Sequence, residues 1–104
     1  MSEFQFAAQT SEISDGEKLL VEVDQRRVIL FQSGGEYFCM DDVCTHDGGT
    51  LSDGGFSDFE ITCPRHGARF DIRTGCPLSM PATQPTKTHQ VKVDGDQILV
   101  KLND

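Results

Sequence analysis

Two short segments of the chain each bring a cysteine and a histidine close together. The segment CTHDGGTL contains Cys44 and His46, and nineteen residues after Cys44 the segment CPRHGARF contains Cys63 and His66. The spacing is Cys-X-His, then sixteen residues, then Cys-X-X-His. Thiolate sulfur and imidazole nitrogen bind zinc and iron in proteins. These four residues are therefore candidate ligands of one metal centre held by two loops.

Structural zinc is the simplest interpretation of such a set. A zinc finger typically groups its two cysteines and its two histidines separately, whereas each segment here supplies one of each. Coincidence is a weaker explanation, because both pairs are tight and both are followed by glycine. The residue types alone therefore indicate a metal centre without naming its metal.

The rest of the chain must position these segments, and its apolar pattern predicts strands. Apolar and polar residues alternate in short runs, which Asp-Gly turn signals interrupt. No segment has sustained helical periodicity. The sequence therefore predicts an all-β fold, an antiparallel β-sandwich or small barrel scaffold with a loop-rich lobe. The expected strands cover residues 19–24, 28–32, 36–40, 59–62, 70–72, 91–93 and 98–102.

The length of 104 residues corresponds to a single domain, residues 1–104. One region of it differs in composition. Residues 43–86, approximately, are rich in Gly, Pro, Thr and Asp and contain both Cys/His pairs. We expect this region to form a metal-binding lobe set on the β scaffold rather than a second domain.

Charge and apolar content limit the partners and the compartment. The chain has 17 Asp and Glu against 9 Lys and Arg, a net charge of −8. Nucleic acid and anionic membranes repel such a surface, so neither is an expected partner. The N-terminus lacks the features of a secretory signal, and no apolar run is long enough to cross a bilayer, which predicts a cytoplasmic protein.

The remaining cysteines are expected to be reduced in that compartment. Cys39 is interpreted as a small core residue, and Cys76 lies near the metal-binding lobe. A disulfide between them is a minor alternative. His89 lies at the beginning of the strand region expected around residues 91–93 and is interpreted as a packed or solvent-facing residue.

The motifs CTH and CPRHG closely resemble those of the Rieske-type ferredoxins, and the resemblance covers nearly the whole chain. It implies the Rieske fold and one 2Fe–2S cluster. Cys44 and Cys63 would bind one iron of this cluster, and His46 and His66 the other. Because two neutral imidazoles replace two thiolates, the reduction potential is higher than that of an all-cysteine cluster.

The same resemblance gives roles to the surrounding loop residues. Gly48, Gly49 and Gly67 would let backbone N–H groups approach the cluster, and MPATQP, residues 80–85, would cover it. Asp47 would accept a hydrogen bond near His46, although an Asp-Gly turn needs no such role. Arg65 and Arg69 would soften the charge of the reduced site, with ordinary solvent-exposed arginines as the alternative.

The chain departs from the cytochrome bc-type members of the family at four positions. Those members join the two ligand loops by a disulfide, whereas this chain has Gly49 and Arg65 at the two places. They also carry a serine and a tyrosine that donate hydrogen bonds to the cluster or its cysteine sulfur, where this chain has Ala68 and Phe70. Such hydrogen bonds favour the more negative, reduced state. Their absence predicts a low-potential centre.

The resemblance implies a one-electron carrier without catalytic residues of its own. It would take electrons from a flavin-dependent ferredoxin reductase and pass them to the terminal oxygenase of a ring-hydroxylating dioxygenase system. The acidic chain would dock as a monomer on a basic patch of its partner. The alternatives are a small Rieske subunit of a nitrite-reductase-like enzyme, an iron–sulfur sensor, an accessory protein of cluster assembly, and a zinc-stabilised interaction module.

Overall fold

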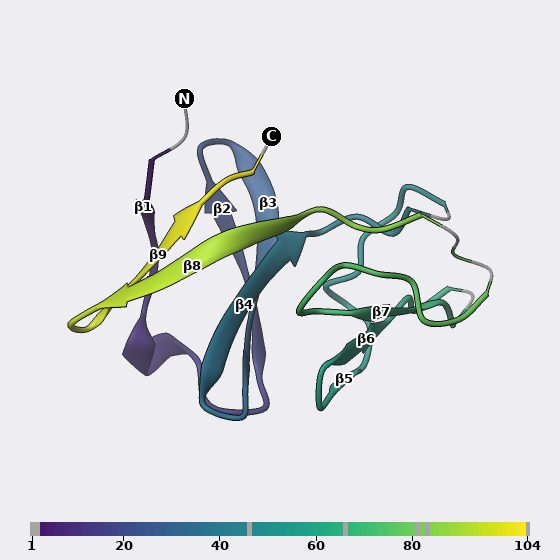
Figure 1. Ribbon diagram of the computed structural model, residues 1–104, viewed down its shortest axis with the longest axis horizontal. Coiled ribbons are helices and arrows are strands. Elements are labelled where there is room, and N and C mark those ends of the chain that lie inside the picture. Colours follow the sequence, from purple (N-terminus) through teal and green to yellow (C-terminus); the bar gives the residue numbers. More distant parts are fainter. Residues whose placement is uncertain (1–2, 46, 66, 81, 83, 104) are drawn as a thin grey trace.

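The computed structural model describes residues 3–45, 47–65, 67–80, 82 and 84–103. These residues contain nine strands and one short 3-10 helix, and the strands form two antiparallel sheets (Figure 1). None of the described helical residues belongs to a helix long and apolar enough to cross a membrane. The predicted all-β antiparallel fold is confirmed.

The larger sheet has six strands in the order β1–β9–β8–β4–β3–β2. The two edge strands of this order, β1 and β2, also contact each other, so the sheet is nearly closed into a barrel (Figure 1). Its strands are β1 (Gln5–Gln9), β2 (Lys18–Val23), β3 (Arg26–Ser33), β4 (Glu36–Asp41), β8 (Thr88–Asp94) and β9 (Gln97–Lys101), and the helix η1 (Thr10–Glu12) follows β1.

Between β4 and β8 the chain leaves the barrel and forms a second unit, the lobe (residues 43–86). Figure 1 shows the small sheet of the lobe beside the barrel. The beginning and end of the lobe lie next to each other, because Asp41 N–H donates to the Lys87 carbonyl at 2.9 Å. The three strands of this sheet, in the order β5–β6–β7, are β5 (Phe56–Ser57), β6 (Glu60–Thr62) and β7 (Arg69–Asp71).

The strand β3 contributes to two hydrophobic cores, because successive side chains of a strand point to opposite faces. Val28 and Leu30 pack into the barrel core, whereas Ile29 and Phe31 pack into the lobe core. All four side chains are fully buried. This double burial explains why the sequence is continuously apolar there instead of alternating. It also joins the lobe firmly to the barrel.

The two remaining cysteines have no disulfide. Cys39 lies in the barrel core, as predicted, and Cys76 is exposed in the lobe, and both are free thiols. Burial, assisted by the charge of Asp41, raises the pKa of the Cys39 thiol to about 12. Cys39 therefore stays protonated and acts as an apolar side chain.

His89 is a buried structural residue that connects three parts of the barrel. Its Nε2 lies 2.6 Å from Asp41 Oδ1, and its Nδ1 accepts the backbone N–H of Asn103 at 3.0 Å. A backbone N–H can only donate, so Nδ1 carries no proton and Nε2 donates to the carboxylate. The ring therefore ties β8 to the end of β4 and to the segment after β9.

We expect His89→Leu to lower the free energy of unfolding by about 1–3 kcal/mol, because two polar groups lose the ring as their partner. Chemical denaturation followed by circular dichroism would measure the loss. Gln97→Leu, at an exposed position of β9, is the control and should change stability little. Equal losses in the two variants would contradict the structural role of His89.

Candidate metal centre

The first ligand loop, residues 44–49, follows β4 and closes on itself. Cys44 N–H donates to the Gly49 carbonyl and Gly48 N–H donates to the Cys44 carbonyl, both at 2.7 Å. Gly48 has φ +75°, a left-handed conformation that favours glycine. Asp47 Oδ1 accepts Gly49 N–H at 2.9 Å. These bonds hold Cys44 in a tight turn.

The second ligand loop, residues 63–68, repeats the same backbone pattern directly after β6. Cys63 N–H donates to the Ala68 carbonyl at 2.7 Å, and Gly67 N–H donates to the Cys63 carbonyl at 3.0 Å. Gly67 has φ +76°. The two cysteines therefore stand in equivalent turns, in which Gly67 corresponds to Gly48.

The two cysteine sulfurs meet between these loops. Cys44 Sγ, Cys63 Sγ and a carboxylate oxygen of Asp47 all lie within 4.8 Å of one another, and both cysteines are buried. Paired buried thiols are soft ligands that suit iron or zinc. The structure thus brings together two of the four candidate ligands, whereas His46 and His66 lie outside the described residues.

An ion pair that the sequence analysis missed bridges the two loops. Arg65 Nε donates to Asp47 Oδ2, and Arg65 Nη2 donates to Asp47 Oδ1 at 3.0 Å and to the Thr50 carbonyl at 2.9 Å. The guanidinium lies against Gly49, where an added Cβ would be 2.5 Å from Arg65 Cζ. The hydrogen bond from Arg65, followed by that from Gly49 N–H, holds the pKa of Asp47 well below its usual range.

A buried carboxylate that the sequence analysis did not single out holds the start of the first loop in place. Asp42 Oδ1 accepts the backbone N–H groups of Leu51 at 2.7 Å and Ser52 at 2.8 Å. Its other oxygen, Oδ2, accepts the Ser52 hydroxyl at 3.0 Å. Asp42, two residues before the ligand loop, is thus tied to the segment that follows the loop.

The proline-containing segment, residues 80–85, lies against the first loop. Thr45 Oγ1 donates to the Gln84 carbonyl at 2.7 Å, thirty-nine residues along the chain. This contact places part of the segment at the metal centre, where the resemblance expects a cover. Its residues Pro81 and Thr83 lie outside the described part of the chain.

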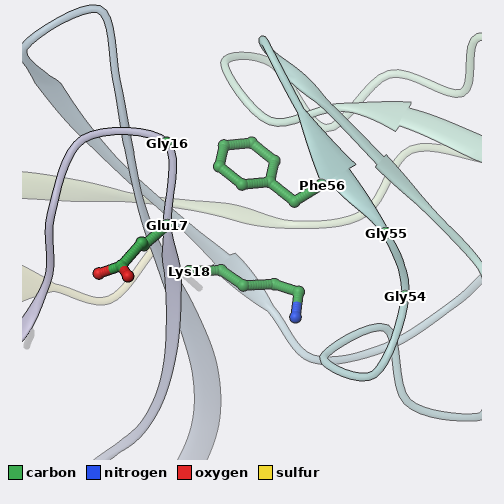
Figure 2. Close-up of a pocket in the computed structure, with 6 residues that line it drawn as sticks. All are labelled: Gly16, Glu17, Lys18, Gly54, Gly55 and Phe56. Carbon is green, nitrogen blue, oxygen red and sulfur yellow. The ribbon is translucent and has the colours of Figure 1, made fainter.

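A cavity between the barrel and the lobe is a separate feature. It has a volume of about 380 Å³. Figure 2 shows the residues that line it. Its lining contains no thiol or imidazole, so it contributes nothing to the metal centre. The lining residues are Gly16, Glu17, Lys18, Gly54, Gly55 and Phe56.

Comparison with known proteins decides which metal group the site takes. Residues 3–100 match the family model described as the Rieske [2Fe-2S] domain. The chain belongs to this family. The resemblance to Rieske-type ferredoxins is therefore confirmed, and the cofactor of this Rieske protein is a [2Fe-2S] cluster rather than a zinc ion.

Individual Rieske relatives match along nearly their whole length. The protein is 39% identical over 92 residues to the ferredoxin component of the naphthalene 1,2-dioxygenase system of Pseudomonas aeruginosa, a match that covers 88% of each chain. Its structure resembles the ferredoxin of carbazole 1,9a-dioxygenase from Nocardioides aromaticivorans IC177, with a TM-score of 0.90 and 31% identity over 96% of this chain and 98% of that one. It also resembles a chain in the complex of reduced oxygenase and oxidised ferredoxin of carbazole 1,9a-dioxygenase, with a TM-score of 0.87 and 28% identity over 94% and 92% of the two chains.

The described residues of the Rieske protein fit a [2Fe-2S] cluster. Two buried sulfurs project from equivalent turns and face each other, which is the arrangement that a shared thiolate-bound iron requires. The buried Ala68 and Phe70 follow the second cysteine, and neither side chain can donate a hydrogen bond to sulfur.

We expect Ala68→Ser to raise the reduction potential of the Rieske protein by some tens of millivolts, and Phe70→Tyr to act in the same direction. A hydrogen bond to a charged group contributes about 1.5–3 kcal/mol, and only the difference between the two redox states appears in the potential. Rieske centres span about −150 to +300 mV, and the wild-type value should lie near the bottom of this range.

Protein-film voltammetry would measure these potentials, with Ala7→Ser on β1 as a control distant from the cluster. A wild-type potential well above zero, or no change in either variant, would show that the missing donors do not control the site.

Proposed function

We propose that this Rieske protein is the ferredoxin component of an aromatic-ring dioxygenase system, where it carries one electron at a time at low potential. The observation that carries the proposal is the match to the naphthalene-system ferredoxin over 88% of both chains. The name of that relative describes a ferredoxin component, which supports an electron carrier for this chain.

In this proposal Cys44 and Cys63 hold one iron, and His46 and His66 hold the other. The proximity of the two sulfurs and the equivalence of their turns support the cysteine half of this assignment. Held by these residues, a 2Fe–2S cluster would supply one-electron redox chemistry. The protein contributes the two loops, which orient the ligands and exclude water from the buried sulfurs.

The partners we propose are a flavin-dependent ferredoxin reductase as donor and a terminal oxygenase as acceptor. The similar carbazole-system chain in a complex of oxygenase and ferredoxin supports the acceptor. We place the monomeric carrier in the cytoplasm, in keeping with the free thiols of Cys39 and Cys76.

The proposed function can be tested with the purified protein. It should contain two iron and two sulfide ions per chain and give a Rieske-type electron paramagnetic resonance spectrum after reduction with dithionite. The reduced protein should then deliver one electron per chain to a dioxygenase terminal oxygenase and repeat the cycle without losing iron.

Other results would support the alternatives. Stoichiometric zinc without an iron signal would overturn the proposal. Transfer of the whole cluster to an apo-acceptor would indicate an assembly protein, and loss of the cluster after one redox cycle would indicate a sensor. Electron delivery to a nitrite reductase but not to an oxygenase would indicate the nitrite-reductase-like subunit.

Electron transfer to the partner should become slower as salt is added. The net charge of −8 predicts attraction to a basic docking patch, and a Debye length of about 8 Å at physiological salt screens that attraction. Stopped-flow mixing of reduced carrier and oxidised oxygenase would give the second-order rate at each ionic strength. A rate that stays flat from low to high salt would contradict docking through the acidic surface.

A further inference from the structure

The two ligand loops carry a histidine and a charged residue in opposite order: His46 and Asp47 in the first loop, Arg65 and His66 in the second. Their equivalent turns make position 46 correspond to position 65, and position 47 to position 66. At each of these two pairs of positions, one loop has a histidine and the other has a charged residue. The two charged residues, Asp47 and Arg65, pair with each other across the loops.

We propose that Asp47 and Arg65 form an inter-loop clamp that positions the two ligand loops around the cluster and balances the charge beside its sulfurs. The inference rests on the proposed four-ligand site. The planar guanidinium makes two hydrogen bonds to the carboxylate and a third to the Thr50 carbonyl, so both loops are held in one geometry.

The position of the clamp also gives it an electrostatic role. An oxygen of Asp47 lies within 4.8 Å of the sulfurs of Cys44 and Cys63. A negative charge this close opposes the arrival of an electron, and the positive charge of Arg65 offsets it. Removing one partner therefore leaves the charge of the other acting on the cluster. The two removals should shift the reduction potential in opposite directions.

Four variants of the cluster-loaded protein test the clamp. Arg65→Gln removes the positive charge, Arg65→Lys keeps the charge but loses the planar fork, and Asp47→Asn removes the negative charge. Arg69→Gln is the matched control, because Arg69 lies on β7 and pairs with Glu60 at 3.1 Å, away from the clamp. The measurements are the midpoint potential, the spectrum of the reduced protein, and the rate at which visible absorbance is lost with a chelator.

We expect Arg65→Gln to release the cluster about tenfold faster than the wild type, by analogy with the roughly 10–100-fold loss of metal affinity on removal of a group that holds a metal ligand. Its potential should fall, whereas that of Asp47→Asn should rise with a similar increase in release rate. Arg65→Lys should release the cluster quickly while its potential stays close to the wild-type value. Arg69→Gln should release the cluster at the wild-type rate.

A second route to the same result leaves both charged residues in place. Gly49→Ala adds a Cβ where the Arg65 guanidinium lies, so it should displace this group and speed cluster release. This variant decides the question if the charge variants fail to accumulate.

The clamp is overturned if Arg65→Gln behaves like Arg69→Gln, or if Arg65→Gln and Asp47→Asn shift the potential in the same direction. It is also overturned if Asp47→Asn abolishes the Rieske spectrum, because Asp47 would then be a ligand. A wild-type protein without this spectrum would instead overturn the proposed function, and the clamp with it.

Discussion

Cys63→Ser should yield a colourless protein that has lost its iron and the ordered fold of the lobe. Cys63 supplies one of the two buried sulfurs and directly follows β6, so the second loop loses its anchor. Because cluster binding and folding of the site are linked, loss of the cluster also removes the binding energy that stabilises the folded lobe. Visible absorbance, iron analysis and limited proteolysis would show these losses.

The exposed Cys76 provides the control for this substitution. Cys76→Ser makes the same chemical change in the lobe, at a free thiol. It should keep its colour, its iron and its resistance to protease. A Cys63→Ser protein that retains the wild-type spectrum would show that another residue ligates the iron.

Gly54→Ala should destabilise the lobe by about 1–3 kcal/mol or more and reduce the amount of cluster it holds, because overpacking forces the backbone to move. An added Cβ at Gly54 would lie only 1.7 Å from the Thr62 carbonyl oxygen. Thr62 directly precedes Cys63, so the displaced backbone carries a proposed ligand with it. Thermal unfolding and iron content per chain would measure the two effects.

The next residue offers a closely matched control. A Cβ added at Gly55 would meet no atom within 4 Å, although Gly55 directly follows Gly54 in the chain. Gly55→Ala should therefore leave stability and iron content nearly unchanged. If the two variants lose stability equally, chain flexibility rather than close backbone approach explains the effect.

The barrel strands could be predicted because apolar and polar residues alternate along a half-buried strand. Val23, Ile98 and Val100 are buried as that pattern required. The pattern failed at β1, where the register shifts between Phe6 and Ala8 and breaks the alternation. It also failed at β5, which has only two residues. Such short or irregular pairings form because neighbouring strands offer hydrogen bonds, which a local pattern does not contain.

One turn also escaped prediction because it contains no glycine and therefore no Asp-Gly signal. β2 and β3 are joined through Asp24 and Gln25, which both adopt positive φ without glycine. The long, well-matched strands on either side impose this conformation on the turn. The Asp94-Gly95 hairpin, in contrast, was correctly predicted from its sequence, and Asp94 pairs with Gln97 across it.

The metal centre, too, was predictable only where it depends on residues close together in the sequence. The sequence identified the ligand candidates because residue type and spacing within each loop are local features. It missed the contacts that hold the loops, because Asp47 and Arg65 are eighteen residues apart and Asp42 acts on Leu51 nine residues away. Such pairs become visible only when the fold places them together.

The double burial of β3 has a consequence for the chain before it receives its cluster. If the lobe is unfolded in the cluster-free chain, one side of the barrel exposes Ile29, Phe31 and Met40 to water. A contiguous apolar surface of this kind promotes association and is the feature by which chaperones and proteases select their clients. We therefore expect iron supply to set the lifetime of newly made chains, so that a cell short of iron would clear this carrier instead of storing it empty.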